Sequence, residues 1–353
     1  MSIEDLQNLR LGQLNVLIGA NGAGKSNLVT FFQMLGEMIE QRLAKWVAIQ
    51  GTADRVLCFG AKHTRTLRAT IEFGYNTYSF ELESDNNGAF VFASETLGFA
   101  GKIGFVSEPQ GSGHREAKLK DLAHSSSHVG VSDDCYQSIS SWRVYHFHDT
   151  TAESGMKRFV AVHDNQYLRP HAENLAAFLY RLLRETPDTY NQIRETIRLA
   201  LPFFDDFVLR PIALDTQEEV INVRWRQRDN DYELWPSQLS DGSLRFICLV
   251  VALLQPQPPT TIVIDEPELG LHPHAITLFA SLLRSASTRM QVIITTQSVS
   301  LVNEFSINDL IIVEQADGTS TFKRHDEANF TTWLNDYTVG DLWQKNLLGG
   351  RPR

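Results

Sequence analysis

Apolar positions along the chain repeat with two periods, and together these predict an α/β fold. Residues 65–93 alternate between apolar and polar, with the turn formers "YNT" and "DNNG" between runs, which predicts an antiparallel meander. The segments 26–43 and 173–201 carry apolar residues at helical spacing. In the second half, the apolar runs "TTIVID" and "QVIITT" alternate with helical patterns, which is typical of a parallel sheet covered on both faces.

Two other segments lack such a period. Residues 101–140 are rich in Gly, Ser, His and charged residues, so we expect an irregular insertion there, followed by the strand-like "WRVYHF" at 142–147. The C-terminal tail contains Trp333 and Trp343, and we expect it to dock on the core. A small polar turn, Ser240–Ser243, stands directly before nine apolar residues, which predicts a capped helix beginning at a turn rich in backbone donors.

Composition narrows the class of protein. The 353 residues are 42% hydrophobic, and the net charge of −10 argues against an extended nucleic-acid surface. Cys58, Cys135 and Cys248 show no metal-binding spacing, so we expect reduced thiols and a cytoplasmic location. The longest apolar run, 246–254, is too short to cross a membrane, and the first residues do not resemble a signal peptide.

The motif "GANGAGKS" predicts a phosphate-binding loop between a buried strand and a helix. Its glycines allow successive backbone N–H groups to point at phosphate oxygens, and the helix N-terminus adds partial positive charge. Lys25 is expected to bridge the β- and γ-phosphates of a nucleoside triphosphate, and the Ser26 hydroxyl to ligate Mg²⁺. Within this motif, the expected nucleotide contacts are Gly19, Ala20, Asn21, Gly22, Ala23, Gly24, Lys25, Ser26 and Asn27.

A second motif, "TTIVIDEPELGLHP", ends an apolar strand with two carboxylates. We expect Asp265 to hold Mg²⁺ and Glu266 to orient the attacking water as a general base, a role worth ~10²–10⁴ in rate. Paired with the phosphate loop, these carboxylates predict binding and hydrolysis of a nucleoside triphosphate.

Taken in order, "GANGAGKSN", "LSDGSLRF", "VIDEPELGLHP" and "VIITTQS" resemble the motifs of ABC-type head ATPases of the SMC and RecF group. The match is close to stand-alone bacterial proteins identified as AAA-family or RecF/SMC-like ATPases. The resemblance implies a P-loop NTPase fold with a mostly parallel core sheet and an antiparallel β subdomain. It further implies that Ser240, Asp241 and Gly242 bind the γ-phosphate of ATP held by a second protomer, so that ATP drives formation of a homodimer.

Two residues depart from the pattern of that group. Asp241 stands where relatives usually have Gly, and we expect its carboxylate to turn back and cap its own helix. Gln297 stands where many relatives carry a histidine; it can donate a hydrogen bond to the γ-phosphate but carries no charge, so we expect slow turnover.

The role of "YHFHDTT" stays open. His146 and His148 share one strand face and Asp149 follows them, but no third metal ligand stands at a recognisable spacing. A loop that couples the γ-phosphate to partners, a satisfied polar patch and a metal site are the three alternatives.

We expect one composite ATPase domain in three parts. Residues 1–99 carry the phosphate loop and the meander, and residues 100–235 form an inserted lid and helical region. Residues 236–353 carry the catalytic strand and the polar turn Ser240–Ser243, which we call the signature turn. No heptads fill the insertion, so the protein is a head without a coiled coil. Two functions compete. One is an ATP-driven dimeric switch acting with a separate effector protein, a nuclease or toxin, in DNA repair or phage defence, with DNA binding left open. The other is a nucleotide-binding regulator with no DNA role. A membrane-transporter cassette fits poorly.

Overall fold

A computed structural model describes residues 1–101, 104–125, 130–151 and 153–351. The chain divides into two compact units, each with its own hydrophobic core. Unit 1 comprises residues 1–9, 21–142 and 313–322; unit 2 comprises residues 10–20, 143–312 and 323–353. The expected three-part division of the chain stays a prediction.

A parallel sheet forms the centre of unit 2. Its strands follow the order β15-β1-β14-β13-β6, and every pairing among them is parallel. The bounds are β1 (Leu14–Ile18), β6 (Arg143–Tyr145), β13 (Thr261–Asp265), β14 (Gln291–Thr296) and β15 (Leu310–Ala316). β1, β13 and β14 are almost wholly buried, which explains their continuous apolar runs. The predicted α/β class with a mostly parallel core sheet is confirmed.

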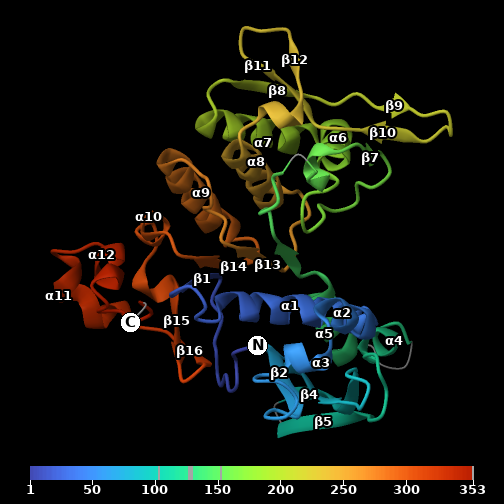
Figure 1. The fold of residues 1–353 in the computed structure, drawn as a ribbon, viewed down its shortest axis with the longest axis vertical. Coiled ribbons are helices and arrows are strands. Elements are labelled where there is room, and N and C mark those ends of the chain that lie inside the picture. Colours follow the sequence, from blue (N-terminus) through green and yellow to red (C-terminus); the bar gives the residue numbers. More distant parts are fainter. Residues whose placement is uncertain (102–103, 126–129, 152, 352–353) are drawn as a thin grey trace. The chain divides into compact units, whose positions relative to one another are not determined.

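The apolar run after the polar turn forms the most buried helix of unit 2. Every side chain of α8 (Asp241–Leu254) from Ser243 onward is buried, because α7 (Pro187–Ala200) and α9 (Pro273–Ala286) pack on it (Figure 1). The other helices of the unit are α6 (Leu175–Glu185), α10 (Val299–Val302), α11 (Thr331–Leu334) and α12 (Val339–Gln344), with the 3₁₀ turns η1 (Gly155–Lys157), η2 (Pro236–Gln238), η3 (Ile307–Asp309) and η4 (Glu327–Phe330).

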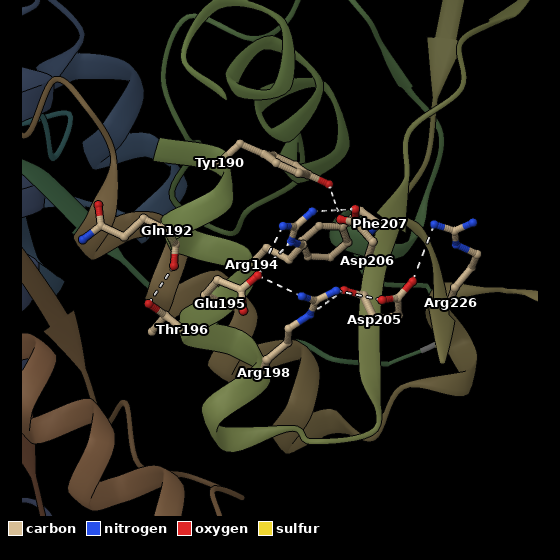
Figure 2. Close-up of polar contacts among 10 residues, drawn as sticks. All are labelled: Tyr190, Gln192, Arg194, Glu195, Thr196, Arg198, Asp205, Asp206, Phe207 and Arg226. Carbon is tan, nitrogen blue, oxygen red and sulfur yellow. Dashed lines mark hydrogen bonds and ion pairs between the residues drawn. The ribbon is translucent and has the colours of Figure 1, made fainter. Parts of the chain in front are cut away.

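Charged side chains fasten α7 to the neighbouring strand β8 (Phe204–Val208). Tyr190 donates to Asp206 at 2.7 Å, and Arg198 donates to Asp205 at 2.7 Å, as Figure 2 shows. Burial, together with the Asp206 carboxylate, raises the pKa of Tyr190. The Arg226 guanidinium, on β11 (Arg224–Gln227), lies 3.5 Å from the Asp205 carboxylate. These arginines are therefore matched by carboxylates within the fold.

Two small antiparallel sheets complete unit 2. One has the order β12-β11-β8, in which β11 and β12 form an antiparallel hairpin; the other has the order β7-β10-β9. Their remaining strands are β7 (Val160–Ala161), β9 (Ile212–Ala213), β10 (Glu219–Ile221), β11 (Arg224–Gln227) and β12 (Glu233–Leu234).

Unit 1 contains the predicted meander as an antiparallel sheet of order β2-β3-β4-β5. The strands are β2 (Thr66–Phe73), β3 (Asn76–Ser84), β4 (Phe90–Gly101) and β5 (Gly104–Gly111). The helices of this unit are α1 (Lys25–Ile39), α2 (Leu43–Gln50), α3 (Ala53–Val56), α4 (Leu119–Ala123) and α5 (Val131–Ser140). β15 continues from unit 2 into this unit, where it pairs with β16 (Thr319–Lys323).

The expectation of an irregular insertion at 101–140 was wrong, since its described residues include β5, α4 and α5. β5 is the edge strand of the meander and nearly all its residues are exposed, so it has no alternating apolar pattern by which to recognise it. The expectation that the C-terminal tail docks on the core holds for one of its two tryptophans. Trp343 is buried in the core of unit 2, whereas Trp333 is 46% exposed.

Candidate functional site

The glycine-rich loop begins where β1 ends. Ile18 is in register with Thr296 of β14, so Gly19 leaves the sheet at the edge where Gln297 also leaves it. Farther along the loop, Gly24 has a left-handed φ of 109° and forms the N-terminal cap of α1. Only glycine takes that conformation without strain, and it lets α1 begin abruptly at Lys25. The loop therefore ends at a helix N-terminus, the arrangement that phosphate binding needs.

Two serines distant in sequence hold this loop within unit 1. Ser320 of β16 donates its hydroxyl to the Ala23 carbonyl at 2.6 Å, and its oxygen also lies 2.6 Å from the Ser2 hydroxyl. Asn27 donates to Ser2 at 2.6 Å. A β-carbon on Gly24 would come within 2.0 Å of the Ser320 hydroxyl oxygen. The serine brace, Ser2 and Ser320, thus fixes the loop and requires glycine at position 24.

The two expected catalytic carboxylates lie at the carboxyl end of β13. Asp265 is the last residue of that strand, and its carboxylate accepts a hydrogen bond from the Thr295 hydroxyl. Glu266 follows with a φ of 43°, an uncommon conformation for a residue with a side chain. Its backbone N–H donates to both oxygens of Thr295 at 3.1 Å. Gln297 donates its side-chain amide to the Glu266 carboxylate. Unit 2 therefore brings Asp265, Glu266 and Gln297 together at one sheet edge.

A third carboxylate, Glu268, lies behind them and was not singled out from the sequence. It accepts from the Thr296 hydroxyl at 2.5 Å and from the Gln297 backbone N–H at 3.1 Å. Its second oxygen is buried without a partner among the described residues. Burial raises the pKa of Glu268, and the neighbouring Glu266 acts in the same direction. Glu268 thus fixes the backbone from which Gln297 projects.

The polar turn before α8 is capped differently from our expectation. Ser240, rather than Asp241, is the N-cap residue, and its hydroxyl oxygen accepts from the Ser243 N–H at 3.1 Å. Asp241 is instead the first residue of α8; its side chain is 65% exposed and lies 3.6 Å from the Lys157 ammonium. The expected capping role of Asp241 was wrong, because Ser240 stands one position earlier with the extended backbone that a cap needs.

Gly242 packs against another backbone turn. A β-carbon at this position would lie 2.1 Å from the Gly270 carbonyl oxygen. The turn after the carboxylates and the polar turn of the signature are thus in direct contact within unit 2. Glycine at position 242 is required by this contact, independently of any approach to a nucleotide.

Arg245 was also missed, although it connects three segments of unit 2. Its guanidinium donates to the carbonyl of Phe147 at 2.8 Å, to that of His148 at 3.3 Å and to that of Leu269. The residue is only 8% exposed, and burial lowers its pKa. Neither its charge nor its position in an apolar helix predicts this role, since every acceptor is backbone.

The histidine segment after β6 lies beside β13. His148 donates from Nε2 to the Asp265 carbonyl at 2.8 Å, and burial lowers the pKa of His146. Possible ligand atoms of His146, His148 and Asp265 lie within 4.8 Å of one another. Asp149 is engaged elsewhere, accepting from the Thr151 hydroxyl at 2.7 Å and its N–H at 3.1 Å. A third potential ligand therefore comes from β13, which spacing within "YHFHDTT" could not show.

The C-terminal residues also reach this edge of the sheet. Gly350 is close enough that a β-carbon on it would lie 3.5 Å from the Gly19 Cα atom and from the indole nitrogen of Trp343. That indole nitrogen is buried without a hydrogen-bond partner among the described residues. Among the described helices, none combines the length and the hydropathy needed to span a membrane.

Solved structures of SMC head domains are similar to this chain in fold. The chain is 15% identical to the SMC head in "Crystal structure of the SmcHead bound to the C-winged helix domain of ScpA", with a TM-score of 0.53 and coverage of 91% of this chain and 93% of that chain. An SMC head derived from Pyrococcus furiosus aligns with a TM-score of 0.49 at 13% identity, covering 93% and 94% of the two chains. The Thermotoga maritima SMC head aligns with a TM-score of 0.41 at 14% identity, covering 92% and 95%. None of the curated protein sequences compared matches this chain.

Fold and sequence together define a P-loop ATPase of the AAA/ABC type, related to SMC and RecF-like heads. Residues 14–303 match the family described as "AAA domain, putative AbiEii toxin, Type IV TA system". The chain belongs to this family.

Proposed function

We propose that the protein binds ATP with Mg²⁺ and hydrolyses it slowly. The observation that carries the proposal is the meeting of Asp265, Glu266 and Gln297 at the edge of the sheet where β1 leads into the glycine-rich loop. A loop with a helix N-terminus, combined with two carboxylates at the carboxyl end of a parallel strand, suits phosphate and metal chemistry.

In this proposal, residues 19–27 bind the phosphates, with Lys25 neutralising their charge. Ser26 and Asp265 offer the hard oxygen ligands that Mg²⁺ prefers, and the Thr295 hydroxyl already orients the Asp265 carboxylate. Bound Mg²⁺ supplies charge neutralisation at the phosphates. Glu266 orients the attacking water and accepts its proton, while Gln297 holds the Glu266 carboxylate in position.

Slow turnover follows from the neutral amide of Gln297. It donates a hydrogen bond but adds no positive charge where negative charge develops in the transition state.

We further propose that ATP binding drives two protomers together, with Ser240, Asp241 and Gly242 of each completing the nucleotide site of the other. The Ser240 cap leaves the N-terminus of α8 at the signature turn, and its backbone N–H groups favour an anion. The SmcHead of similar fold is bound to a winged-helix domain of ScpA. The family description names a toxin of a type IV toxin–antitoxin system. Both favour action through a separate protein partner.

The test is Glu266→Gln, which should bind ATP without hydrolysing it. We expect this variant to double in solution mass only with Mg²⁺-ATP, measured by light scattering, and to lose phosphate release. Glu218→Gln, an exposed carboxylate of the same unit, is the matched control and should keep wild-type turnover. A mass that ignores ATP would refute the dimeric switch, while undiminished phosphate release would refute the role of Glu266.

A second candidate is a nucleotide-binding regulator that does not contact DNA, favoured by the net charge of −10. Phosphate release measured at low salt with single- and double-stranded DNA and RNA distinguishes this regulator from an ATPase that acts directly on nucleic acid. Stimulation by any polynucleotide that declines with added salt supports a direct nucleic-acid role; no response to all of them supports the regulator.

A further inference from the structure

Three side chains of unit 2 converge from two neighbouring strands. His146 and His148 follow β6, and Asp265 ends β13, which pairs with β6 in parallel. Possible ligand atoms of the three residues lie within 4.8 Å of one another. We propose that His146, His148 and Asp265 bind a divalent transition-metal ion, of which Zn²⁺ is the representative probe.

The spacing suits such an ion after small side-chain rotations. A tetrahedral ion with bonds of about 2.1 Å holds its ligand atoms roughly 3.4 Å apart. The separation of at most 4.8 Å therefore has to close by no more than about 1.4 Å. A closure of this size is within the range of side-chain rotation, so the proposed site requires no change of backbone.

Two of the three ligands, His148 and Asp265, also have a hydrogen-bond partner that orients them. His148 donates its Nε2 hydrogen to the Asp265 carbonyl at 2.8 Å, which leaves the lone pair on Nδ1. Thr295 donates to the Asp265 carboxylate. Hydrogen bonds of this kind, from the second ring nitrogen to a carbonyl and from a hydroxyl to the carboxylate, accompany protein metal ligands and fix their direction.

The backbone that carries the two histidines is itself held in place. Arg245 donates to the carbonyls of Phe147 and His148, and His171 donates from Nδ1 to the His146 carbonyl at 3.0 Å. The His171 ring centroid lies 6.0 Å from that of His146. A cluster of imidazoles on a fixed backbone is pre-organised, which lowers the cost of closing around an ion.

The ligand chemistry selects the kind of ion. Two imidazoles with one carboxylate suit Zn²⁺, Co²⁺, Ni²⁺ or Fe²⁺, whereas Mg²⁺ prefers oxygen ligands and water. Millimolar Mg²⁺ should therefore fail to displace Zn²⁺ from the nucleotide-free protein.

Binding of the ion stands independently of ATP hydrolysis, but one consequence rests on the proposed function. Asp265 is the carboxylate proposed to hold Mg²⁺, so a transition-metal ion bound by His146 and His148 would take that ligand away. Zn²⁺ should accordingly inhibit phosphate release in the wild type and inhibit it less when either histidine is replaced.

The experiment uses the full, tag-free chain without nucleotide. Zn²⁺ binding is measured by calorimetry in the presence of millimolar Mg²⁺, and Co²⁺ binding by its visible absorption. The variants are His146→Gln, His148→Gln and Asp265→Asn, with the exposed His163→Gln as the matched control. Circular dichroism and thermal melting establish that each variant folds.

We expect one Zn²⁺ per wild-type or His163→Gln chain, a tetrahedral Co²⁺ spectrum, and affinity at least ~10-fold lower in each ligand variant. Zn²⁺ affinity unchanged in all three ligand variants would overturn the proposal, as would a wild-type protein that binds no Zn²⁺. If one variant unfolds, the other two decide. A protein that binds Zn²⁺ through these residues but releases no phosphate would refute the proposed ATPase and leave the metal site standing.

Discussion

Replacing Arg245 with Met removes the connection among three segments of unit 2 while keeping an unbranched side chain in α8. The hydrogen bond from Arg245 to the Phe147 carbonyl is buried. A buried acceptor left without a donor costs about 2 kcal/mol. The carbonyls of His148 and Leu269 are only partly buried and can regain water, so each adds ~0.5–1 kcal/mol. Met carries no charge, so the variant avoids the cost of desolvating a buried guanidinium, which offsets about 1 kcal/mol of this sum. We expect a net loss of about 2–3 kcal/mol in unfolding free energy.

Urea unfolding followed by tryptophan fluorescence measures this loss, and hydrogen exchange shows where it occurs. Amides of α8, of the segment after β6 and of the turn at Leu269 should exchange faster together, because one side chain holds all three. Arg289→Met is the matched control: this exposed arginine donates to one carbonyl, that of Leu253, at 2.7 Å. Its replacement should cost under ~1 kcal/mol. If Arg245→Met were no more destabilising than Arg289→Met, the role assigned to the three carbonyls would be refuted.

Four further substitutions test the site. Gly24→Ala, at a φ of 109°, should weaken ATP binding at least ~10-fold in a fluorescent-nucleotide titration, and unchanged affinity would contradict the serine brace. Gly242→Ala should lower the unfolding free energy by about 1–3 kcal/mol through its clash with the Gly270 carbonyl; an unaltered urea midpoint would show that the turns separate freely. Burial raises the pKa of Glu268, so its proton favours the folded state at low pH, and that contribution is lost as pH rises from ~4.3 through the folded pKa. The unfolding free energy from urea titrations should therefore fall less between pH 4 and 8 in Glu268→Gln than in the wild type, by about 1.4 kcal/mol for each unit of raised pKa, and parallel profiles would exclude this linkage. Gln297→His should release phosphate faster than the wild type, and equal or slower release would count against the explanation of slow turnover.

Local periodicity predicted most of the fold, because burial determines which positions are apolar. The apolar run after the polar turn indicated the helix α8, and the alternation at 65–93 indicated the meander. β5 was missed for the converse reason. An edge strand with both faces exposed needs only backbone hydrogen bonds to β4, and those leave no pattern in side-chain polarity.

The residues of the candidate site likewise divide into those that a short motif reveals and those that it does not. The glycine-rich loop and the pair Asp265–Glu266 are visible because their chemistry is encoded within a few consecutive residues. Arg245 and Glu268 act through backbone groups distant in the sequence, which no short motif records. Sequence spacing also failed for the histidine segment, since its third potential ligand, Asp265, follows His148 by 117 positions.

The N-cap residue of α8 could not be identified from the sequence for a different reason. Both Ser240 and Asp241 are good capping residues, and the choice between them depends on which one has extended backbone dihedrals. That difference of one position decides whether the Asp241 carboxylate is engaged or exposed, and composition alone does not fix it.

The serine brace has a consequence for how the protein is made. The Ala23 carbonyl and Ser320 are 297 positions apart, so the glycine-rich loop lacks this support until Ser320 has been synthesised and has left the ribosome. At roughly 5–20 residues per second, synthesis from the loop to the serine takes on the order of 15–60 s. During that time the nascent chain carries the phosphate-binding motif without the contact that fixes it. If the loop binds nucleotide as proposed, chains that end before Ser320 should bind it more weakly than chains that contain this serine.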